Sequence, residues 1–309
     1  MYTLSIVVPC YNEEESVDLF YQATQKVVSE MPVIPEYIFV NDGSKDDTLE
    51  KLRALQKRDQ EHVHYISFSR NFGKESALYA GLQASTSDYV VDMDADLQDP
   101  PEMLPTMLEL LQTGDWDCVG TRRVDRKGEN KIISFFSDGF YKIINKLSQT
   151  QIVSGARDFR MMTRQMVNAV LSLKEYSRFS KGIFSWVGFR TKYLDYHNHE
   201  RVAGKTSWSP IGLVKYALSG ISNFSLLPLT ISVWIGGLSF ILSIIGLICV
   251  IVRHAIDPSA AIFGWSSLVC IILLIGGLQL LCIGIIGHYI GKIFLQTKNR
   301  PIYIIQEQK

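Results

Sequence analysis

The fold is decided by the stretch Val90-Val91-Asp92-Met93-Asp94-Ala95-Asp96-Leu97-Gln98-Asp99-Pro100-Pro101. An apolar run leads into alternating carboxylates and stops at a double proline, the pattern of a buried strand that ends in a functional loop. Side chains two apart along an extended backbone point the same way, so Asp94 and Asp96 are expected to converge. Two converging carboxylates repel each other unless a cation lies between them. The stretch therefore predicts a site for a hard divalent cation.

Three interpretations of these acids compete. A calcium loop of the EF-hand type starting at Asp92 needs a glycine at Leu97 and a glutamate at Met103, so it fails at two positions. A solvated acidic turn does not explain why a hydrophobic strand delivers the acids. The third is a Mg or Mn site at Asp94 and Asp96 that also holds the diphosphate of a nucleotide. It is favoured because these ions keep few protein ligands and take phosphate oxygens for the rest.

Five strand-like runs alternate with helical patterns along the first part of the chain, at 4–8, 37–40, 64–68, 89–93 and 116–119. This alternation predicts an α/β, Rossmann-like domain with a parallel sheet and crossover helices. Polar segments follow the first three runs at 9–13, 41–44 and 69–74. Because ligands bind at the carboxyl ends of parallel strands, these segments and the acidic loop are the expected site.

Two acids in the polar segments have both a structural and a functional interpretation. Glu13 suits the positive N-terminal end of a helix, and it also lies where a carboxylate could accept a ribose hydroxyl. Asp42 fits an Asp-Gly turn, and it also fits a carboxylate that accepts N–H donors from a nucleobase. The sequence leaves both choices open.

Charge is distributed unevenly along the chain. Lys and Arg total 31, as do Asp and Glu, so the net charge of zero says nothing about partners. Charged residues are absent between Lys215 and Arg253 and again between Asp257 and Lys292. Each gap exceeds the roughly 20 apolar residues that cross a bilayer. Transmembrane helices are therefore predicted at about 229–252 and 261–289, with buried helices of a soluble domain as the alternative.

The domain order follows from these segments. We expect a catalytic domain over 1–208, which includes a basic amphipathic helix at about 131–148 that fits a membrane interface or a solvated domain face. A second interfacial helix and linker cover 209–227, two transmembrane helices cover 228–290, and a tail covers 291–309. The N-terminus begins on a strand without a basic n-region. Lys and Arg before the first span and after the second place the catalytic domain and both termini in the cytosol.

Four motifs together resemble the family-2, inverting nucleotide-sugar glycosyltransferases of the GT-A fold. They are Val-Val-Pro-Cys-Tyr-Asn-Glu-Glu (7–14), Val-Asn-Asp-Gly-Ser (40–44), Arg-Asn-Phe-Gly-Lys (70–74) and Asp-Ala-Asp-Leu-Gln-Asp-Pro-Pro (94–101). With the C-terminal hairpin, the whole chain resembles the polyprenyl-phosphate glycosyltransferases, the group of bacterial bactoprenol glucosyltransferases and dolichyl-phosphate mannose synthases.

The resemblance implies a donor site. In it the nucleoside is surrounded by Pro9, Tyr11, Glu13 and Asp42, the metal and diphosphate are held by Asp94 and Asp96, and the donor sugar lies by Gln98. Lys74 and Ala95 complete the expected donor-binding set.

Three residues are the expected catalytic groups: Asp96, Arg122 and Asp158. The resemblance places Arg122 near the donor diphosphate. Asp158 precedes Phe159-Arg160 as in the family pattern Gly-Asp-Phe-Arg, although Ala156-Arg157 departs from that pattern. Asp158 would lie beside the reacting centre, as a base or as a group that orients the acceptor. An ion pair of Asp158 with Arg157 or Arg160 is the structural alternative.

The acceptor phosphate is assigned to Lys131 and Ser137, in the first interfacial segment, and to Arg201 and Lys205. The last two lie in Arg201-Val202-Ala203-Gly204-Lys205-Thr206-Ser207, which resembles the family loop Arg-X-Ala-Gly-X-Ser-Lys with its lysine displaced. A cationic loop just before the membrane is expected from either arrangement.

The expected activity is inverting transfer of one sugar, with UDP-glucose favoured among UDP-hexoses, to undecaprenyl or another polyprenyl phosphate. The chain would be a multi-pass protein of the cytoplasmic membrane that forms a homo-oligomer, uses Mg or Mn and has no nucleic-acid partner. A processive polysaccharide synthase would carry a Gln-X-X-Arg-Trp motif, which does not occur. A non-catalytic subunit that assists lipid flipping is the other alternative, although neither Asp94 nor Asp96 is lost.

Overall fold

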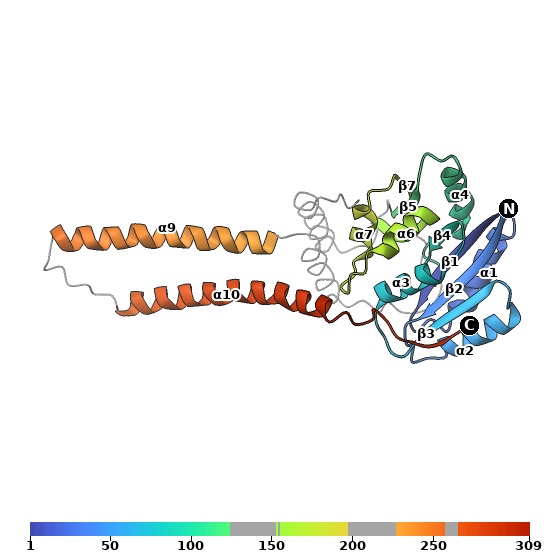
Figure 1. Ribbon diagram of the computed structural model, residues 1–309, viewed down its shortest axis with the longest axis horizontal. Coiled ribbons are helices and arrows are strands. Elements are labelled where there is room, and N and C mark those ends of the chain that lie inside the picture. The colour runs from blue at the N-terminus through green and yellow to red at the C-terminus, as the bar shows by residue number, and fades with distance from the viewer. Residues whose placement is uncertain (124–152, 154, 197–226, 257–264) are drawn as a thin grey trace. The chain divides into compact units, whose positions relative to one another are not determined.

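The computed structural model describes residues 1–123, 153, 155–196, 227–256 and 265–309. These residues belong to two compact units (Figure 1). The first contains the described residues up to Tyr196 together with Arg300–Lys309, and the second contains helices α9 (Leu227–Ile256) and α10 (Trp265–Thr297). The predicted interfacial helices and the domain boundary at 208 lie outside the described residues.

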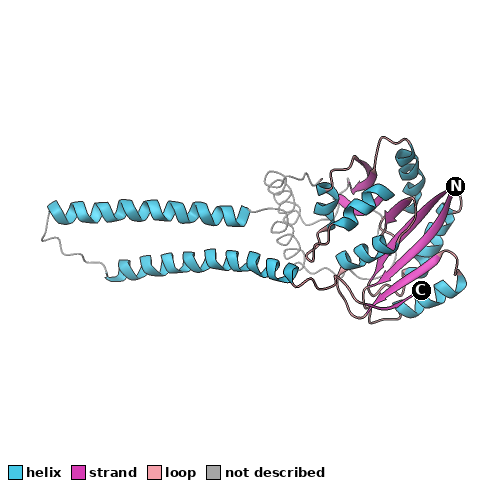
Figure 2. Ribbon diagram, viewed as in Figure 1, coloured by secondary structure: helices cyan, strands magenta, loops and turns pink. Residues whose placement is uncertain are grey.

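The described part of the first unit is built on an eight-stranded sheet of order β7-β5-β6-β4-β1-β2-β3-β8 (Figure 2). The strands are β1 (Tyr2–Cys10), β2 (Val33–Asn41), β3 (Val63–Phe68), β4 (Tyr89–Asp92), β5 (Cys118–Arg123), β6 (Ala156–Thr163), β7 (Thr191–Tyr196) and β8 (Ile305–Gln308). Strand β1 pairs in parallel with β2 and β4, and β2 pairs in parallel with β3. The expected parallel core is therefore confirmed.

The sheet as a whole is mixed, which the sequence analysis did not predict. Strand β6 runs antiparallel to β4 and β5, and β8 runs antiparallel to β3. The fifth predicted strand, at 116–119, overlaps only the beginning of β5, which continues to Arg123. Rossmann-like crossovers account for β1 to β4, whereas β6 is inserted between β4 and β5 with reversed direction.

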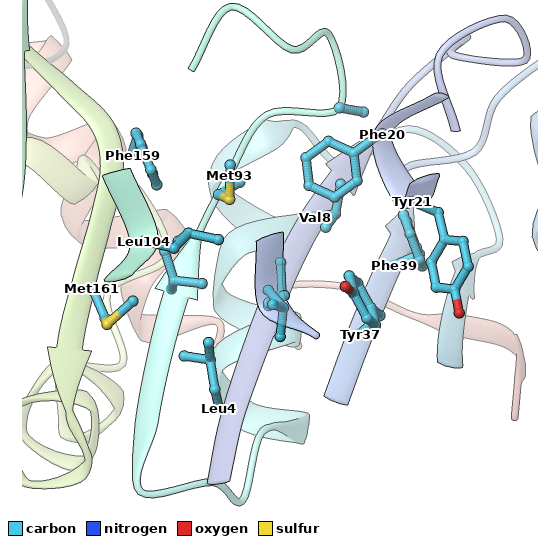
Figure 3. Packing of buried hydrophobic residues seen from close by; sticks show 14 of the residues in the cluster. Leu4, Val8, Phe20, Tyr21, Tyr37, Phe39, Met93, Leu104, Phe159 and Met161 are labelled. Carbon is cyan, nitrogen blue, oxygen red and sulfur yellow. The ribbon is translucent and has the colours of Figure 1, made fainter. Parts of the chain in front are cut away.

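Helices cover both faces of the sheet because its central strands are apolar on both faces. In β2, Tyr37 and Phe39 join the core cluster that includes α1 (Val17–Val28) and α4 (Leu104–Gln112), as Figure 3 shows. The alternate residues Ile38 and Val40 join a second cluster with α3 (Lys74–Ala84). The other helices described in this unit are α2 (Thr48–Arg58), η1 (Pro101–Met103), α6 (Arg164–Ser172) and α7 (Ser180–Trp186).

Close packing of α3 on β1 depends on Gly81. A Cβ at this position would lie 2.2 Å from Cγ1 of Val7, well inside van der Waals contact. The absence of a side chain lets the helix approach the strand. Lys74 is the first residue of α3, so this contact also fixes the position of Lys74 at the carboxyl ends of the strands.

The C-terminal residues return to the first unit. The sequence predicts a tail over 291–309, but α10 continues to Thr297 and Ile305–Gln308 form β8 beside β3. Tyr303 stacks on Phe68 with ring centroids 4.8 Å apart, and Ser69 N donates to Ile304 O at 3.0 Å. The last ten residues therefore support the end of β3. A four-residue strand beyond a long apolar helix carries too little periodicity to be predicted.

Replacing Glu307 by Gln should lower the stability of this edge strand. The Glu307 carboxylate accepts hydrogen bonds from Arg53 (Nε to Oε1, 3.0 Å) and from the Tyr65 hydroxyl. These bonds lower the pKa of Glu307 from 4.5 to about 2. An acid with a lowered folded-state pKa stabilises the fold above its unfolded pKa. We expect the Tm of E307Q to fall by about 1–4 °C at pH 7, a difference that vanishes between pH 4.5 and 2.

Glu50 provides the matched control for this measurement. It also binds Arg53, at an exposed position, so E50Q removes one partner of Arg53 and leaves the contact with β8 intact. We expect E50Q to change Tm less than E307Q. Equal shifts for the two variants, or a shift for E307Q that persists at pH 2, would show that the ion pair does not hold β8.

The second unit consists of two long apolar helices. Segments Pro228–Gly246 and Leu274–Thr297 are long and apolar enough to cross a membrane, with mean hydropathies of 2.0 and 1.7. Neither segment is buried within the chain, and Trp234, Val233 and Leu274 are each more than 70 % exposed. Large apolar side chains exposed along a whole helix mark contact with lipid or another protein. Among the described residues, none buries these two segments, as the alternative of a soluble domain would require.

Candidate functional site

The candidate site lies where the parallel strands end. Strands β1, β2, β3 and β4 present their carboxyl ends at one edge of the sheet, as expected for a ligand site of an α/β fold. Because β6 is antiparallel to β4, it begins at this same edge. Asp92 pairs with Arg160, and continuation of this register places Asp158 across from Asp94. Residues far apart in the sequence are thus brought together.

Lys74 joins these two acids. Its Nζ donates to Asp94 Oδ2 and to Asp158 Oδ2, both at 2.8 Å, and lies 2.6 Å from Asp94 Oδ1. Burial would lower the pKa of Lys74, but the charges of Asp158 and Asp94 outweigh burial and raise it well above its ordinary value. Burial would raise the pKa of Asp158, but Lys74 and Lys181 hold it well below its usual range. Lys74 and Asp158 are therefore both charged at neutral pH.

The alternative ion pair of Asp158 with Arg157 or Arg160 does not form. Arg160 instead donates from Nε to the backbone oxygen of Asp158 at 3.3 Å and from a terminal nitrogen to the backbone oxygen of Arg157 at 2.9 Å. Its guanidinium carbon lies 4.0 Å from the centre of the Phe184 ring. Arg160 therefore shapes the start of β6, and the Asp158 carboxylate is left to Lys74.

The carboxylates of Asp94 and Asp96 fit a small divalent cation. The Asp94 side chain is 34 % exposed, whereas Asp96 is 6 % exposed and its Oδ1 accepts the backbone N–H of Gln98 at 3.1 Å. Lys74 contacts both carboxylate oxygens of Asp94, so a metal ion at Asp94 would share this carboxylate with Lys74 or displace it. Among the described residues, no group of three or more His, Cys, Asp or Glu side chains could hold a metal. Mg and Mn need only one or two protein carboxylates when phosphate oxygens complete the shell.

The acidic loop also turns through a left-handed residue. Leu97 has a φ of +57°, a conformation uncommon for a bulky residue and frequent at functional sites. Leu97 thus has the left-handed conformation that a calcium loop gives to its glycine, although the residue is not a glycine. The calcium interpretation still fails at Met103, which has no carboxylate and lies in η1.

The structure gives Asp42 a structural role. The Asp42 carboxylate is 3 % exposed and accepts the backbone N–H groups of Phe72 (2.6 Å) and Gly73 (2.9 Å). Burial raises its pKa to about 6, against the opposing effect of these bonds. Gly43 follows with a φ of +64°, and a Cβ there would lie 2.4 Å from the Arg70 carbonyl carbon. The Asp-Gly turn thus ties the β2 end to the segment that positions Lys74.

The other expected donor residues lie at the same edge. Pro9 is in β1, Tyr11 and Glu13 follow β1, and buried Ala95 lies between the two acids of the β4 loop. Glu13 Oε2 accepts the hydroxyl of Ser16, the N-cap of α1, at 2.8 Å, and its backbone N–H donates to Thr48 Oγ1 at 2.8 Å. Glu13 therefore supports the start of α1, as the structural interpretation predicts.

Arg122 forms an ion pair at the end of β5. Its Nε and one terminal nitrogen donate to the two carboxylate oxygens of Asp195 in β7, at 2.7 and 2.9 Å. Both side chains are more than 40 % exposed. Such exposed pairs contribute little stability. The sequence analysis did not anticipate Asp195, because the parallel pairing of β5 with β7 cannot be read from local patterns.

A buried acid beneath the site was also missed. Asp92 ends β4, is 1 % exposed, and neither of its carboxylate oxygens has a hydrogen-bond partner in the described structure. Burial raises the pKa of Asp92 to about 8, although the charge of Arg160 opposes this. Asp92 is therefore mostly protonated at neutral pH. Its apolar sequence context, Val90-Val91 and Met93, is the signal that could have indicated burial.

A second network lies next to the acidic loop. Arg157 donates from one terminal nitrogen to Gln98 Oε1 at 3.1 Å and from Nε to the hydroxyl oxygen of Tyr196 at 3.3 Å. The Tyr196 hydroxyl donates to Asp99 Oδ1 at 2.9 Å. Tyr196 is 5 % and Asp99 3 % exposed. These side chains connect the loop after β4 with the start of β6 and the end of β7.

The expected acceptor residues cannot be placed. Lys131, Ser137, Arg201 and Lys205 all lie outside the described residues. Of the expected catalytic and donor residues, the structure brings Lys74, Asp94 and Asp158 into direct contact. Asp96 and Gln98 share the loop of Asp94.

The chain is similar to known proteins over most of its length. Residues 5–171 match the family described as "Glycosyl transferase family 2". The bactoprenol glucosyl transferase of Shigella phage SfX is 41 % identical over 310 residues, which cover 99 % of each chain. The prophage bactoprenol glucosyl transferase homolog of Escherichia coli K12 is 40 % identical over 310 residues with the same coverage.

A solved structure is also similar to the chain. It is glucosyl-3-phosphoglycerate synthase from Mycobacterium tuberculosis in complex with Mn2+, UDP-glucose and phosphoglyceric acid. It is 19 % identical, covers 72 % of this chain and 78 % of its own, and has a TM-score of 0.48.

Proposed function

The chain belongs to glycosyltransferase family 2, and on this premise we propose that it moves one hexose from a nucleotide diphosphate to a polyprenyl phosphate. Both proteins of about 40 % identity named above are called bactoprenol glucosyl transferases, and the similarity extends over the whole chain. UDP-glucose is the favoured donor and undecaprenyl phosphate the favoured acceptor. The single observation that carries the proposal is the meeting of Lys74, Asp94 and Asp158 at the strand ends.

The proposed chemistry is one displacement at the anomeric carbon of the sugar. An oxygen of the acceptor phosphate forms the new bond, the bond to the diphosphate breaks, and the diphosphate leaves with the electron pair. The configuration at that carbon is inverted. A phosphate monoester is already ionised at neutral pH, so a strong general base is not required. Positioning of the two substrates and stabilisation of the leaving group supply the acceleration.

Individual residues of the site would each have a role in this displacement. Asp94 and Asp96 would hold Mg or Mn, which when bound supplies positive charge to the departing diphosphate. The positive charge of Lys74 compensates the repulsion between the Asp94 and Asp158 carboxylates, and its hydrogen bonds fix their positions. Asp158, whose pKa is lowered by Lys74 and Lys181, is a weak base and serves to orient Lys74 and the acceptor. Arg122 would reach the diphosphate by exchanging Asp195 for phosphate oxygens.

The two apolar helices suit a lipid acceptor. We propose that α9 and α10 cross the cytoplasmic membrane, with the catalytic unit and both termini in the cytosol, and that the chain forms a homo-oligomer. Lys131, Ser137, Arg201 and Lys205 would bind the acceptor phosphate at the membrane surface. The donor pocket is proposed at Pro9, Tyr11, Glu13, Asp42, Ala95 and Gln98.

A donor panel tests this function. The purified full-length protein is placed in lipid nanodiscs with undecaprenyl phosphate, Mg or Mn, and radiolabelled UDP-glucose, UDP-galactose, UDP-GlcNAc or GDP-mannose. We expect label to enter the lipid fraction from UDP-glucose and not when EDTA is in excess. NMR of the product should show the inverted anomer. Transfer from another donor would correct the sugar, and absence of transfer from all four would reject the proposed function.

A further inference from the structure

Arg157 lies where the sequence departs from the family pattern Gly-Asp-Phe-Arg, and its side chain makes two specific hydrogen bonds. It lies in β6 directly before Asp158. Its guanidinium reaches Gln98 on the β4 loop and Tyr196 at the end of β7. A planar guanidinium with several fixed donors holds such partners in one geometry, which a flexible ammonium does not. The residue therefore connects the acidic loop to a rigid part of the sheet.

The direction of each hydrogen bond in this network is determined by chemistry. A guanidinium only donates, so the Gln98 side chain must present its carbonyl oxygen to Arg157. The Tyr196 oxygen accepts from Arg157 Nε, and its single proton goes to Asp99. Both Tyr196 and Asp99 are almost completely buried. Arg157 is consequently held at its far side and cannot turn without breaking bonds in the interior.

The fixed carbonyl has a consequence for the rest of the Gln98 side chain. With Oε1 turned to Arg157, the two N–H donors of the amide nitrogen can donate only to a different acceptor. The Gln98 backbone N–H meanwhile donates to Asp96 Oδ1 at 3.1 Å. Gln98 is thus anchored on one side to the proposed diphosphate-binding acid and on the other to Arg157. Its amide is a preorganised donor beside the position proposed for the donor diphosphate.

We propose that Arg157 is a positioning residue that selects the donor sugar, because it orients the Gln98 amide to donate to one hydroxyl of the hexose. This inference rests on the proposed function. Arg157 itself acts through Gln98 and not on the reacting atoms. A site that hydrogen-bonds a substrate hydroxyl discriminates against an analogue that lacks it, since its polar groups are then left without a partner.

Monodeoxy donors test this role. Initial rates in nanodiscs with undecaprenyl phosphate are measured for UDP-glucose and its 2-, 3-, 4- and 6-deoxy analogues, with wild type, R157M and R157K. We expect wild type to disfavour one deoxy donor by roughly tenfold, the value of one hydrogen bond. In R157M the ratio of the rate with UDP-glucose to the rate with that deoxy donor should fall to near one. The kcat/KM for UDP-glucose should fall roughly tenfold. R157K should lie between the two.

The binding of UDP alone distinguishes positioning from general damage. UDP lacks the hexose, so its Kd, measured by calorimetry with Mn2+, should change less than threefold in R157M. Arg164 is the matched control, since it follows β6 as the first residue of α6 and donates to the carbonyl oxygens of Ser87 (2.8 Å) and Ser85 (3.1 Å). We expect R164M to lower Tm without changing the ratio between UDP-glucose and its deoxy analogues.

Three outcomes would overturn the inference. The first is an R157M enzyme that keeps the wild-type ratio for every deoxy donor. The second is an R157M enzyme that loses UDP affinity as much as it loses turnover, which would place Arg157 on the nucleotide side. The third is independence of Arg157 and Gln98, seen as additive losses in R157M, Q98A and the double variant. A wild-type protein that transfers none of the hexoses would reject the proposed function and this inference with it.

Discussion

The variants Asp94→Asn and Asp96→Asn are expected to lose roughly 10²- to 10³-fold in kcat, the scale found when one group that stabilises developing charge is removed. Both changes keep the size of the side chain but replace a carboxylate by a neutral amide. Asp94→Asn also removes one of the two anions that face Lys74. The leaving diphosphate would then be misplaced and less stabilised. Transfer of label from UDP-glucose to lipid measures the effect.

Metal binding gives an independent readout for the same variants. The Mn2+ signal in electron paramagnetic resonance should change when UDP is added to wild type and change much less with D94N or D96N. Asp115→Asn is the control, because Asp115 is an exposed acid before β5, at the opposite edge of the sheet. D115N should match wild type in both assays. Full turnover of D96N, or of wild type in excess EDTA, would contradict the metal site.

The parallel half of the fold could be predicted because its signal is local. Val7-Val8, Ile38-Phe39-Val40 and Val90-Val91 belong to apolar runs that lead into polar segments within a few residues, and both faces of such strands are buried. Antiparallel β6 could not be predicted in this way. Its residues begin with Ala156-Arg157-Asp158, which resemble a loop, and only pairing with β4 makes them a strand.

For the site, the individual residues could be predicted from local motifs, but the contacts between them could not. Asp94, Asp158 and Lys74 could each be named from motifs, but their contact depends on the β4–β6 register, which a motif does not contain. For Asp42 the structural role is evident in its bonds to Phe72 and Gly73, whereas its role toward a nucleobase stays a prediction. The Arg157 network joins three strands, and no spacing in the sequence connects Gln98 with Tyr196.

Replacing Lys74 by Met should affect both activity and stability. Asp94 and Asp158 would face each other without their common cation, and two close carboxylates cannot both stay ionised at low cost. Since the Lys74 side chain is 32 % exposed, water relieves part of the repulsion, and we expect a loss of about 1 to 3 kcal/mol in stability at pH 7. Transfer should fall roughly 10²- to 10³-fold, because neither acid keeps its position.

The pH dependence of K74M separates this explanation from a simple loss of packing. In wild type, Asp158 has a lowered pKa, so its contribution to stability is present above its unfolded pKa and is lost as the pH falls. In K74M, Asp94 and Asp158 together bind a proton at a pH above the unfolded-state pKa of an aspartate. The stability of K74M relative to wild type therefore increases as the pH falls. The difference in Tm between wild type and K74M, measured in metal-free buffer, should therefore shrink from pH 7 to pH 4.

Two further variants complete the test of Lys74. Lys51→Met removes an exposed lysine that lies 3.7 Å from Asp18, and we expect it to match wild type in rate and in Tm. Lys74→Arg keeps the positive charge but changes its shape, so it should recover most of the stability and only part of the rate. A Tm difference for K74M that is the same at pH 4 and pH 7 would show that charge compensation is not what Lys74 supplies. Transfer by K74M within threefold of wild type would remove the lysine from the proposed mechanism, because the positions of Asp94 and Asp158 would then not depend on it.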